Sequence, residues 1–282
     1  MSEIVSVLPR WMLGGAAFFV GASFGSFLNV CVGRWPKELS VVRPRSRCPR
    51  CGREIAWYDN LPMLSWLALR GKCRGCGLAI SPVYPLVELV VALGWLATLV
   101  QFGPTLTAIR VAVFGTILLG VMLTDAVAYV IPDGFTAFGL AWAVLLALIA
   151  YVRDDLSLFA GPGNAVLGAC VGAGAIAIVG WIGEMVLKKE AMGFGDVTLM
   201  AMVGAHLGPG RSLLTIFLGA AIGAVTFLGL VLPLSHWRAR RLGHAPAPPL
   251  VPFGVFLAPG AMIALFWGES LIRWYLHGVL GQ

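Results

Sequence analysis

The sequence predicts an all-α polytopic membrane protein of about eight transmembrane helices, with a small cysteine-bearing loop domain between the first and second helices. Three observations support this fold class. The chain is 59% hydrophobic and 12% charged, with a mean hydropathy of +0.88, far from the usage of soluble domains. Its apolar runs approach the roughly 20 residues that a helix needs to cross a bilayer. One long polar segment, residues 34–82, interrupts these runs and contains four cysteines.

The apolar runs are expected to be helices because a bilayer offers no water to unpaired backbone groups. The first run is too long for a secretion signal and lacks an Ala-x-Ala exit, so it is expected to remain as a helix. Small residues inside the runs allow close helix packing, and examples are Gly21, Gly25, Gly168, Gly172 and Gly174. The predicted helices are residues 11–33, 83–101, 106–124, 134–152, 164–187, 195–209, 212–234 and 253–276.

The basic residues indicate an orientation. If residues 34–82 face the cytoplasm, fifteen Lys and Arg residues lie on that side and five on the other, which places both termini outside the cytoplasm. The formal net charge of +7 then reflects membrane topology. Membrane lipid is therefore the expected surrounding, and nucleic acid is not an expected partner.

The polar segment contains two CxxC pairs, each followed by glycine: Cys48 with Cys51, and Cys73 with Cys76. This spacing is typical of a structural zinc site, because each knuckle presents two thiolates from one tight turn. A cytoplasmic loop lies in a reducing compartment, where metal binding is favoured over disulfides. A redox pair set is the alternative, but a loop with so little core needs a staple. Cys31 and Cys170 lie in apolar runs and are interpreted as inert packing residues.

Two aspartates are the strongest catalytic candidates, because ionisable groups inside apolar helices are costly. Asp125 ends the third predicted helix and Asp196 begins the sixth, and the charge-derived topology puts both at the cytoplasmic face. Two neighbouring carboxylates can hydrolyse a peptide bond, since repulsion keeps one protonated while the other activates water. The titration belongs to the pair, so neither role is assigned to one residue.

The residues around the two aspartates fit this chemistry. Gly193 and Gly195 would allow an extended substrate to approach the backbone beside Asp196, and Pro132 would end the helix near Asp125. A lone carboxylate is better interpreted as an interfacial or capping group. That interpretation applies to Glu88, Asp133 and Glu184, with Glu88 ranked above the rest. Asp154 and Asp155 are expected on the opposite face as ordinary loop residues.

Several motifs occur in a fixed order along nearly the whole chain. They are residues 25–30, the two cysteine knuckles, residues 57–66, 70–74, 80–89 and 125–133, the GxGD box at 193–196, and residues 252–257. A GxGD box alone is a weak signal, whereas the ordered set is specific. The set resembles the type IV prepilin leader peptidase family, a branch of the GxGD aspartyl intramembrane proteases.

This resemblance implies that Asp125 and Asp196 are the catalytic pair of a bacterial inner-membrane peptidase. The substrates would be type IV prepilins or type II secretion pseudopilins, cleaved after a short basic leader at the cytoplasmic face. The chain departs from the family pattern at Thr198, where lysine is usual, and at Val127 and Ala128, where polar or charged residues are common. These changes would alter the electrostatics of the site or its substrate preference.

The resemblance also implies N-methylation of the new N-terminus with S-adenosylmethionine. No glycine-rich nucleotide loop is present, so the cofactor-binding residues stay unassigned, and four residues are candidates only because they lie in matching motifs: Asn29, Asp59, Asn60 and Glu88. The implied domains are a first transmembrane helix at 1–33, a cytoplasmic zinc-binding and candidate methyltransferase loop at 34–82, and an aspartyl peptidase core at 83–282.

Two other functions stay open. Residues 21–25 form GxSxG around Ser23, and His206 lies on a later helix, as a rhomboid-like serine protease would require. Ser23, however, lacks the strand–turn–helix that exposes a nucleophile. The chain could also be a non-catalytic assembly scaffold, or a transporter whose intramembrane acids carry protons. Substitution of the aspartates or of Ser23 distinguishes these functions.

Overall fold

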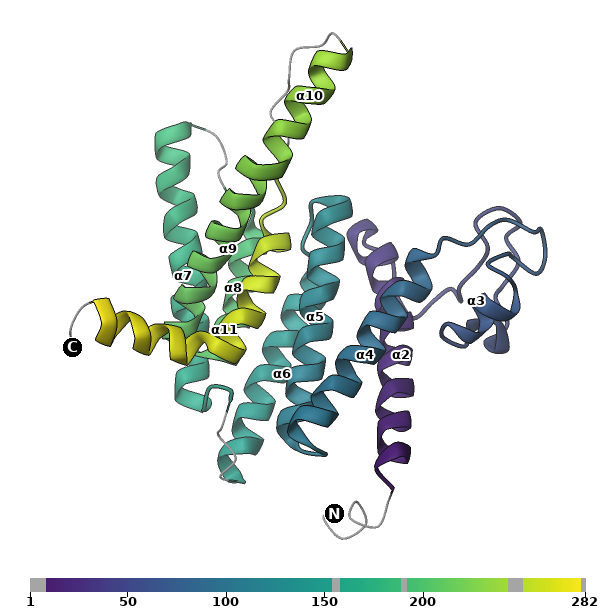
Figure 1. Ribbon diagram of the computed structural model, residues 1–282, viewed down its shortest axis with the longest axis horizontal. Helices are drawn as coiled ribbons and strands as arrows, with labels where there is room; N and C mark the ends of the chain where they lie inside the picture. The colour runs from purple at the N-terminus through teal and green to yellow at the C-terminus, as the bar shows by residue number, and fades with distance from the viewer. Residues whose placement is uncertain (1–8, 154–157, 189–191, 243–250, 280–282) are drawn as a thin grey trace. The chain divides into compact units, whose positions relative to one another are not determined.

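A computed structural model describes residues 9–153, 158–188, 192–242 and 251–279 (Figure 1). Most of these residues are helical, and the cysteine loop, which is largely irregular, contains two isolated β-bridges. Asp154 and Asp155 lie outside the described residues. The longer helices are α2 (Arg10–Arg34), α4 (Val83–Phe102), α5 (Leu106–Ala128), α6 (Asp133–Val152), α7 (Pro162–Leu187), α8 (Phe194–Leu207), α9 (Pro209–Thr226), α10 (Leu232–Leu242) and α11 (Gly254–Trp274).

Within the described ranges, seven helical segments are long and apolar enough to cross a membrane. This confirms the predicted polytopic all-α class. The eighth predicted crossing, residues 195–209, is the helix α8, which has only 14 residues. At about 1.5 Å per residue it is roughly 21 Å long, shorter than a hydrocarbon core of about 30 Å. It is therefore an apolar helix that does not span a bilayer by itself.

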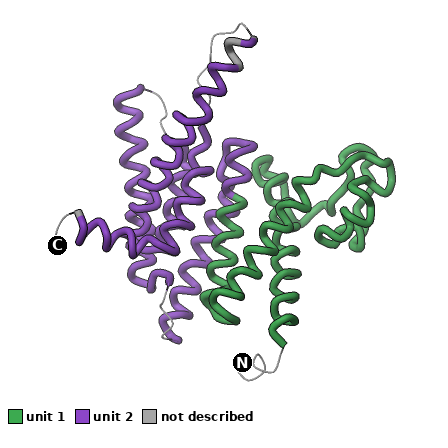
Figure 2. Tube along the Cα trace, viewed as in Figure 1, with its two compact units in different colours: residues 1–120 green, residues 121–282 purple. Residues whose placement is uncertain are grey.

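The chain forms two compact units, residues 1–120 and 121–282 (Figure 2). In the first unit, α2 packs along α4. A Cβ at Gly21 would lie 2.8 Å from the Trp95 Cβ, and one at Gly25 would lie 2.7 Å from the Glu88 Cα. Only glycine allows these two helices to approach so closely, which confirms the predicted packing role of Gly21 and Gly25.

The cysteine loop follows α2 and leads into α4, and it contains the short helices η2 (Trp57–Asn60) and α3 (Leu64–Ala68). Side chains fix this irregular segment internally. The Ser65 hydroxyl donates to the Tyr58 carbonyl at 3.0 Å, and the Trp66 indole N–H donates to the Ile80 carbonyl at 3.1 Å. These bonds tie η2 and the end of the loop to α3.

The second unit is built around α8, which packs against α6, α7, α9 and α11. Leu199, Met200, Met202 and Val203 are fully buried on it. Glycines permit the close crossing of α7 and α8: a Cβ at Gly168 would collide with the Gly204 carbonyl, and one at Gly172 with the Met200 carbonyl. A Cβ at Gly174 would meet nothing within 4 Å, so the predicted packing role of that glycine is wrong.

The last two predicted helices differ from expectation in their ends. Residues 212–234 belong to a longer run, in which a π-helical segment η3 (Phe227–Val231) joins α9 to α10. Another π-helical segment, η4 (Tyr275–Val279), follows α11. Hydrophobic periodicity does not distinguish these wider turns from α-helix, because both keep apolar residues on adjacent turns.

Candidate active site and metal centre

Asp125 lies in the last turn of α5 and is only 5% exposed. Its Oδ2 accepts a hydrogen bond of 3.2 Å from the backbone N–H of Val255, 130 residues later in the chain. A Cβ at Gly254 would lie 2.8 Å from the same oxygen. The start of α11 can therefore press its backbone against the carboxylate only because residue 254 is glycine.

Asp196 lies in the first turn of α8 and is half-buried. Its backbone N–H donates to the Gly193 carbonyl at 3.1 Å, which fixes the turn of the GxGD box. A Cβ at Gly195 would lie 2.9 Å from the Ile131 Cβ. Thr198 donates its hydroxyl hydrogen to the Gly195 carbonyl at 3.0 Å, so its side chain is part of the same turn.

Ile131 connects the surroundings of the two aspartates. Its Cβ faces Gly195, next to Asp196, and its Cδ1 is 3.0 Å from the position of a Cβ on Gly254, next to Asp125. The Asp125 charge also acts on Asp196. The structure thus brings the two predicted carboxylates into one neighbourhood, within the second unit. Carboxylates that lie close enough can share a proton and a water molecule, and the aspartyl interpretation depends on that arrangement.

The segment between α5 and α6 shapes this neighbourhood. Tyr129 adopts a left-handed conformation with φ 55°, directly after α5 ends. Pro132 precedes the first residue of α6, Asp133, as expected for a helix break near Asp125. Val127 is 77% exposed, so the departure from the family pattern at this position is on the surface. Asp133 is exposed and has the ordinary position of an acid in a first turn.

Sequence reasoning missed Gly254, Val255 and Ile131 as parts of this site. Their signal was present in two matching motifs, residues 125–133 and 252–257. The motifs indicated resemblance without indicating contact, because spacing along a chain does not tell which helix start will meet a given carboxylate.

The four loop cysteines form one cluster, with all Sγ atoms within 4.8 Å of one another. Cys48 Sγ and Cys76 Sγ are 3.7 Å apart. Four sulfurs at about 2.3 Å from a tetrahedral zinc ion would be roughly 3.8 Å apart. The donor set and spacing therefore fit a metal ion held by four thiolates and no other protein ligand.

The two knuckles have the same backbone turn. The Cys48 N–H donates to the Arg53 carbonyl at 3.0 Å, and the Cys73 N–H donates to the Leu78 carbonyl at 2.8 Å. Gly52 and Gly77 follow the second cysteine of each pair, and both have φ +69°. The CxxCG repeat thus encodes two equivalent turns, in which glycine takes the left-handed conformation that other residues avoid.

The protonation of the thiols also favours a cation. Backbone N–H groups of Cys51 and then Arg50 lower the pKa of Cys48 to about 6, so its thiolate forms readily. For Cys76, the Leu78 N–H lowers the pKa, but burial and the neighbouring thiols raise it by more. The net result is a pKa raised to about 11. Without a cation, the cluster resists carrying four negative charges. A bound metal ion removes that resistance.

Comparison with known proteins shows the family of the chain. Residues 19–102 match the family described as Bacterial Peptidase A24 N-terminal domain, and residues 112–228 match the Type IV leader peptidase family. A Myxococcus xanthus protein named prepilin leader peptidase/N-methyltransferase is 40% identical, over 86% of this chain and 72% of its own length. The chain belongs to the type IV leader peptidase family. Two further family members carry the same name: one of Aeromonas salmonicida is 33% identical over 99% of this chain and 98% of its own length, and one of Pseudomonas aeruginosa is 37% identical over 92% and 91%. No solved structure matches the chain.

The structure also shows where the other candidate residues of this family member lie. Asn29, Asp59, Asn60 and Glu88 line a single cavity in the first unit. Cys31 is buried in α2, as expected of a packing residue, whereas Cys170 is on an exposed side of α7. Glu184, near the end of α7, is exposed.

The serine-protease alternative finds no support in the local structure. Ser23 lies in the middle of α2, and its hydroxyl donates to the Phe19 carbonyl at 2.9 Å, one turn earlier. His206 is 1% exposed, and its Nδ1 is 2.9 Å from the Met202 carbonyl oxygen. Both contacts are local helix bonds, and neither forms a nucleophile–base pair.

Proposed function

We propose that this chain removes the basic leader from type IV prepilins or type II secretion pseudopilins with Asp125 and Asp196, and then N-methylates the new N-terminus. The main support for cleavage is the packing of Ile131 against both Gly195 and Gly254, because it draws the two carboxylates together. The family and the names of its members favour the same chemistry.

Cleavage would use both carboxyl groups and one water molecule. The ionised carboxylate takes a proton from the water as the oxygen attacks the scissile carbonyl carbon. The protonated carboxyl supplies its hydrogen to the carbonyl oxygen, and the pair then delivers a proton to the leaving amine. The Val255 N–H donates to one Asp125 oxygen, which helps to orient that carboxylate.

The surface around the pair suits a substrate with an apolar helix. Val127, Tyr129 and Phe194 are exposed apolar residues close in sequence to the aspartates. Gly193 and Gly195 leave the backbone of the GxGD box accessible to an extended segment. We place this site at the cytoplasmic face of a bacterial inner membrane, because the bias of Lys and Arg favours that orientation.

The cysteine cluster would hold one structural zinc ion through Cys48, Cys51, Cys73 and Cys76. Four thiolates leave no open coordination position, so the ion would stabilise the loop and would not activate water. The ion thus supplies a cross-link between the two knuckles. S-adenosylmethionine would supply the methyl group for the second reaction.

The decisive experiment incubates the purified protein with a prepilin, with and without S-adenosylmethionine, and analyses the products by mass spectrometry. We expect a shortened pilin in both cases and a gain of one methyl group only with the methyl donor. Asp125→Asn or Asp196→Asn should abolish shortening. Cleavage that survives either change, in a correctly inserted variant, would reject the aspartate pair, and loss on Ser23→Ala alone would favour the serine protease. Shortening that is absent even in the wild type would favour a scaffold or transporter.

A further inference from the structure

The first unit contains a cavity of about 570 Å³, lined by α2, α4 and the cysteine loop. This volume is in the range of small-molecule sites. Neither aspartate of the proposed peptidase site lines it, so cleavage gives it no role. Residues of both charge signs line it, and they include Arg34, Arg53, Asp59 and Glu88.

Glu88 supplies a buried carboxylate on the helix side of this cavity, at 9% exposure. It accepts a 2.7 Å hydrogen bond from the Met63 backbone N–H and a second from the Ser26 hydroxyl. Met63 has φ 57° and ψ −44°, a conformation that is rare for any residue except glycine. The loop is thus held in a strained turn that directs a backbone donor at Glu88.

No Lys, Arg or His side chain forms an ion pair with Glu88 in the part of the chain that the structure describes. Buried carboxylates are normally paired, because removing a charge from water is costly. The two hydrogen bonds compensate only part of that cost. The carboxylate is therefore suited to a cation from outside the chain, such as an ammonium group.

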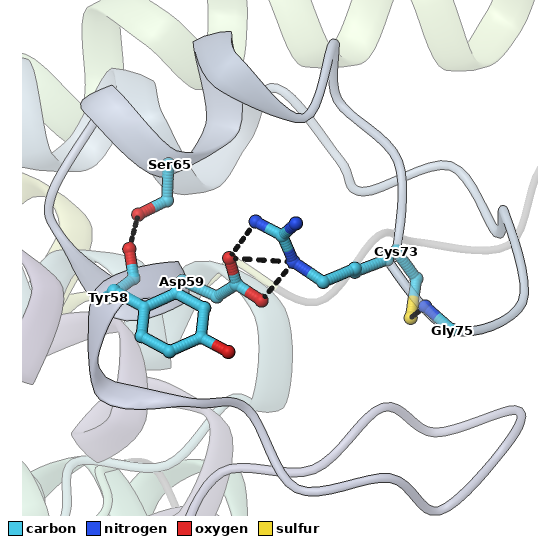
Figure 3. Close-up of polar contacts among 6 residues, drawn as sticks. Tyr58, Asp59, Ser65, Cys73 and Gly75 are labelled. Carbon is cyan, nitrogen blue, oxygen red and sulfur yellow. Dashed lines mark hydrogen bonds and ion pairs between the residues drawn. The ribbon is translucent and has the colours of Figure 1, made fainter.

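The loop side of the cavity is ordered by Asp59 and Arg74 (Figure 3). Arg74 Nε donates to Asp59 Oδ2 at 2.8 Å, and Arg74 Nη2 donates to Oδ1 at 2.6 Å. Arg74 lies between Cys73 and Gly75 of the second knuckle, so the position of this knuckle determines where Arg74 meets Asp59. Trp66, fixed by its bond to Ile80, adds an aromatic surface to the same cavity.

We propose that this cavity binds S-adenosylmethionine and that Glu88 receives the ammonium group of the newly cleaved N-terminus. The inference rests on the proposed methyltransferase function and assigns that function to the cavity in the first unit. The donor has a carboxylate, an ammonium, a sulfonium and an aromatic base, so it requires both charge signs and an aromatic surface. The cavity offers all three.

Glu88 acts as the proton acceptor. The α-ammonium of the substrate gives one proton to the carboxylate, which frees the nitrogen lone pair. That pair bonds the methyl carbon while the carbon–sulfur bond breaks, and its electrons stay on sulfur as a neutral thioether. The methylated nitrogen keeps its positive charge until it releases a further proton to water, and Glu88 returns its own proton to solvent.

The first test measures binding directly. Metal-loaded protein in lipid nanodiscs is equilibrated with radiolabelled S-adenosylmethionine, crosslinked with ultraviolet light and digested. We expect label in peptides from α2, the cysteine loop or the start of α4. Asp59→Asn should weaken binding by up to about 5-fold, because it removes the charge-assisted bidentate bond that orders this side of the cavity. Glu38→Gln, in the same unit but outside the cavity, is the control and should bind like wild type.

The second test separates Glu88 from a merely structural role. Glu88→Gln keeps an oxygen that can accept the Met63 hydrogen bond but removes the charge. Leader cleavage should stay at the wild-type level, while methylation of a cleaved pilin falls about 100-fold at neutral pH. Raising the pH past the amine pKa of about 8 should restore part of the rate, because the substrate then loses its proton unaided.

The outcomes distinguish this inference from the function on which it rests. If the wild type cleaves but neither binds the donor nor methylates, both the methyltransferase function and this site are rejected. If it methylates while the label maps outside the cavity, or while Asp59→Asn and Glu88→Gln behave like wild type, only this site is rejected. If Asp59→Asn weakens the binding of anionic phospholipid but leaves the binding of the methyl donor unchanged, the cavity holds a lipid headgroup. That result would also reject the proposed site.

Discussion

The cysteine loop and the aspartate region are stabilised by opposite means. In residues 38–82 the buried positions are Cys48, Pro62, Ser65 and Gly71, too few for an apolar core. The helix α8 carries Asp196 and buries eight of its 14 residues, which pack against four neighbouring helices. The cysteine cluster and polar bonds thus order the loop, whereas close helix packing orders the aspartates.

Because of this difference, the two regions should tolerate different amino-acid substitutions. The loop can lose surface residues but cannot lose a cysteine, because no core would remain to hold the knuckles together. The aspartate region has no single cross-link, but it depends on glycines where backbones meet. Predictions for the two regions therefore concern different residue types.

The largest effect is expected from loss of the metal. Small zinc domains gain about 10–16 kcal/mol from the ion, more than this loop can recover from burial. Chelation or Cys48→Ser should make the loop sensitive to protease while the helices of the second unit stay protected. Metal analysis should find about one zinc per chain before chelation and less than half of that in Cys48→Ser. Cys170→Ser, outside the cluster, should keep the full metal content, and four freely alkylated thiols in the untreated protein would contradict the site.

The next effect concerns the carboxylates. Asp125→Asn and Asp196→Asn should each lower the rate of leader cleavage at least about 1,000-fold, because each removes one partner of a two-group acid–base system. A gel or mass assay with a purified prepilin measures the loss. Asp133→Asn, at the exposed start of α6, should cleave like wild type. A comparable loss in that control would attribute the effect to general disturbance of the second unit.

A smaller loss is expected at Gly254. Its alanine variant would place a Cβ 2.8 Å from Asp125 Oδ2, so the carboxylate or the start of α11 must move. A displacement of about 1 Å in a catalytic group can cost about 100-fold in rate. Gly174→Ala should leave cleavage unchanged, since its Cβ would meet open space. Equal rates for the two alanine variants would show that the contact between Gly254 and Asp125 does not matter.

The smallest effect is expected from the surface pair Asp59 and Arg74. The Arg74 guanidinium, through its hydrogen bonds and charge, holds the pKa of Asp59 below its ordinary value. The folded carboxyl has the lower pKa, so the pair stabilises the loop above the unfolded value of about 4 and loses this effect as pH falls through the folded pKa. Asp59→Asn should cost at most about 1 kcal/mol by limited proteolysis at neutral pH. A difference from wild type that grows on acidification would contradict this account.

Much of this architecture could be predicted from local patterns. The apolar runs predicted the helices, and the CxxCG repeat predicted two equivalent turns, because both signals come from residues close in sequence. The patterns did not distinguish Gly172, which meets Met200, from Gly174, which meets nothing. Nor did they show that Val255 would bind Asp125, since that contact depends on how distant helices pack. The shortness of α8 was missed because a buried helix and a spanning helix are equally apolar.

The most direct test of the central claim is a cleavage assay on Asp125→Asn, Asp196→Asn and the double variant, side by side. Groups that act as one unit lose their full effect when either is removed. We therefore expect the double variant to cleave no more slowly than either single variant. Losses that multiply in the double variant, or a single variant with substantial activity, would show that the two carboxylates do not act together.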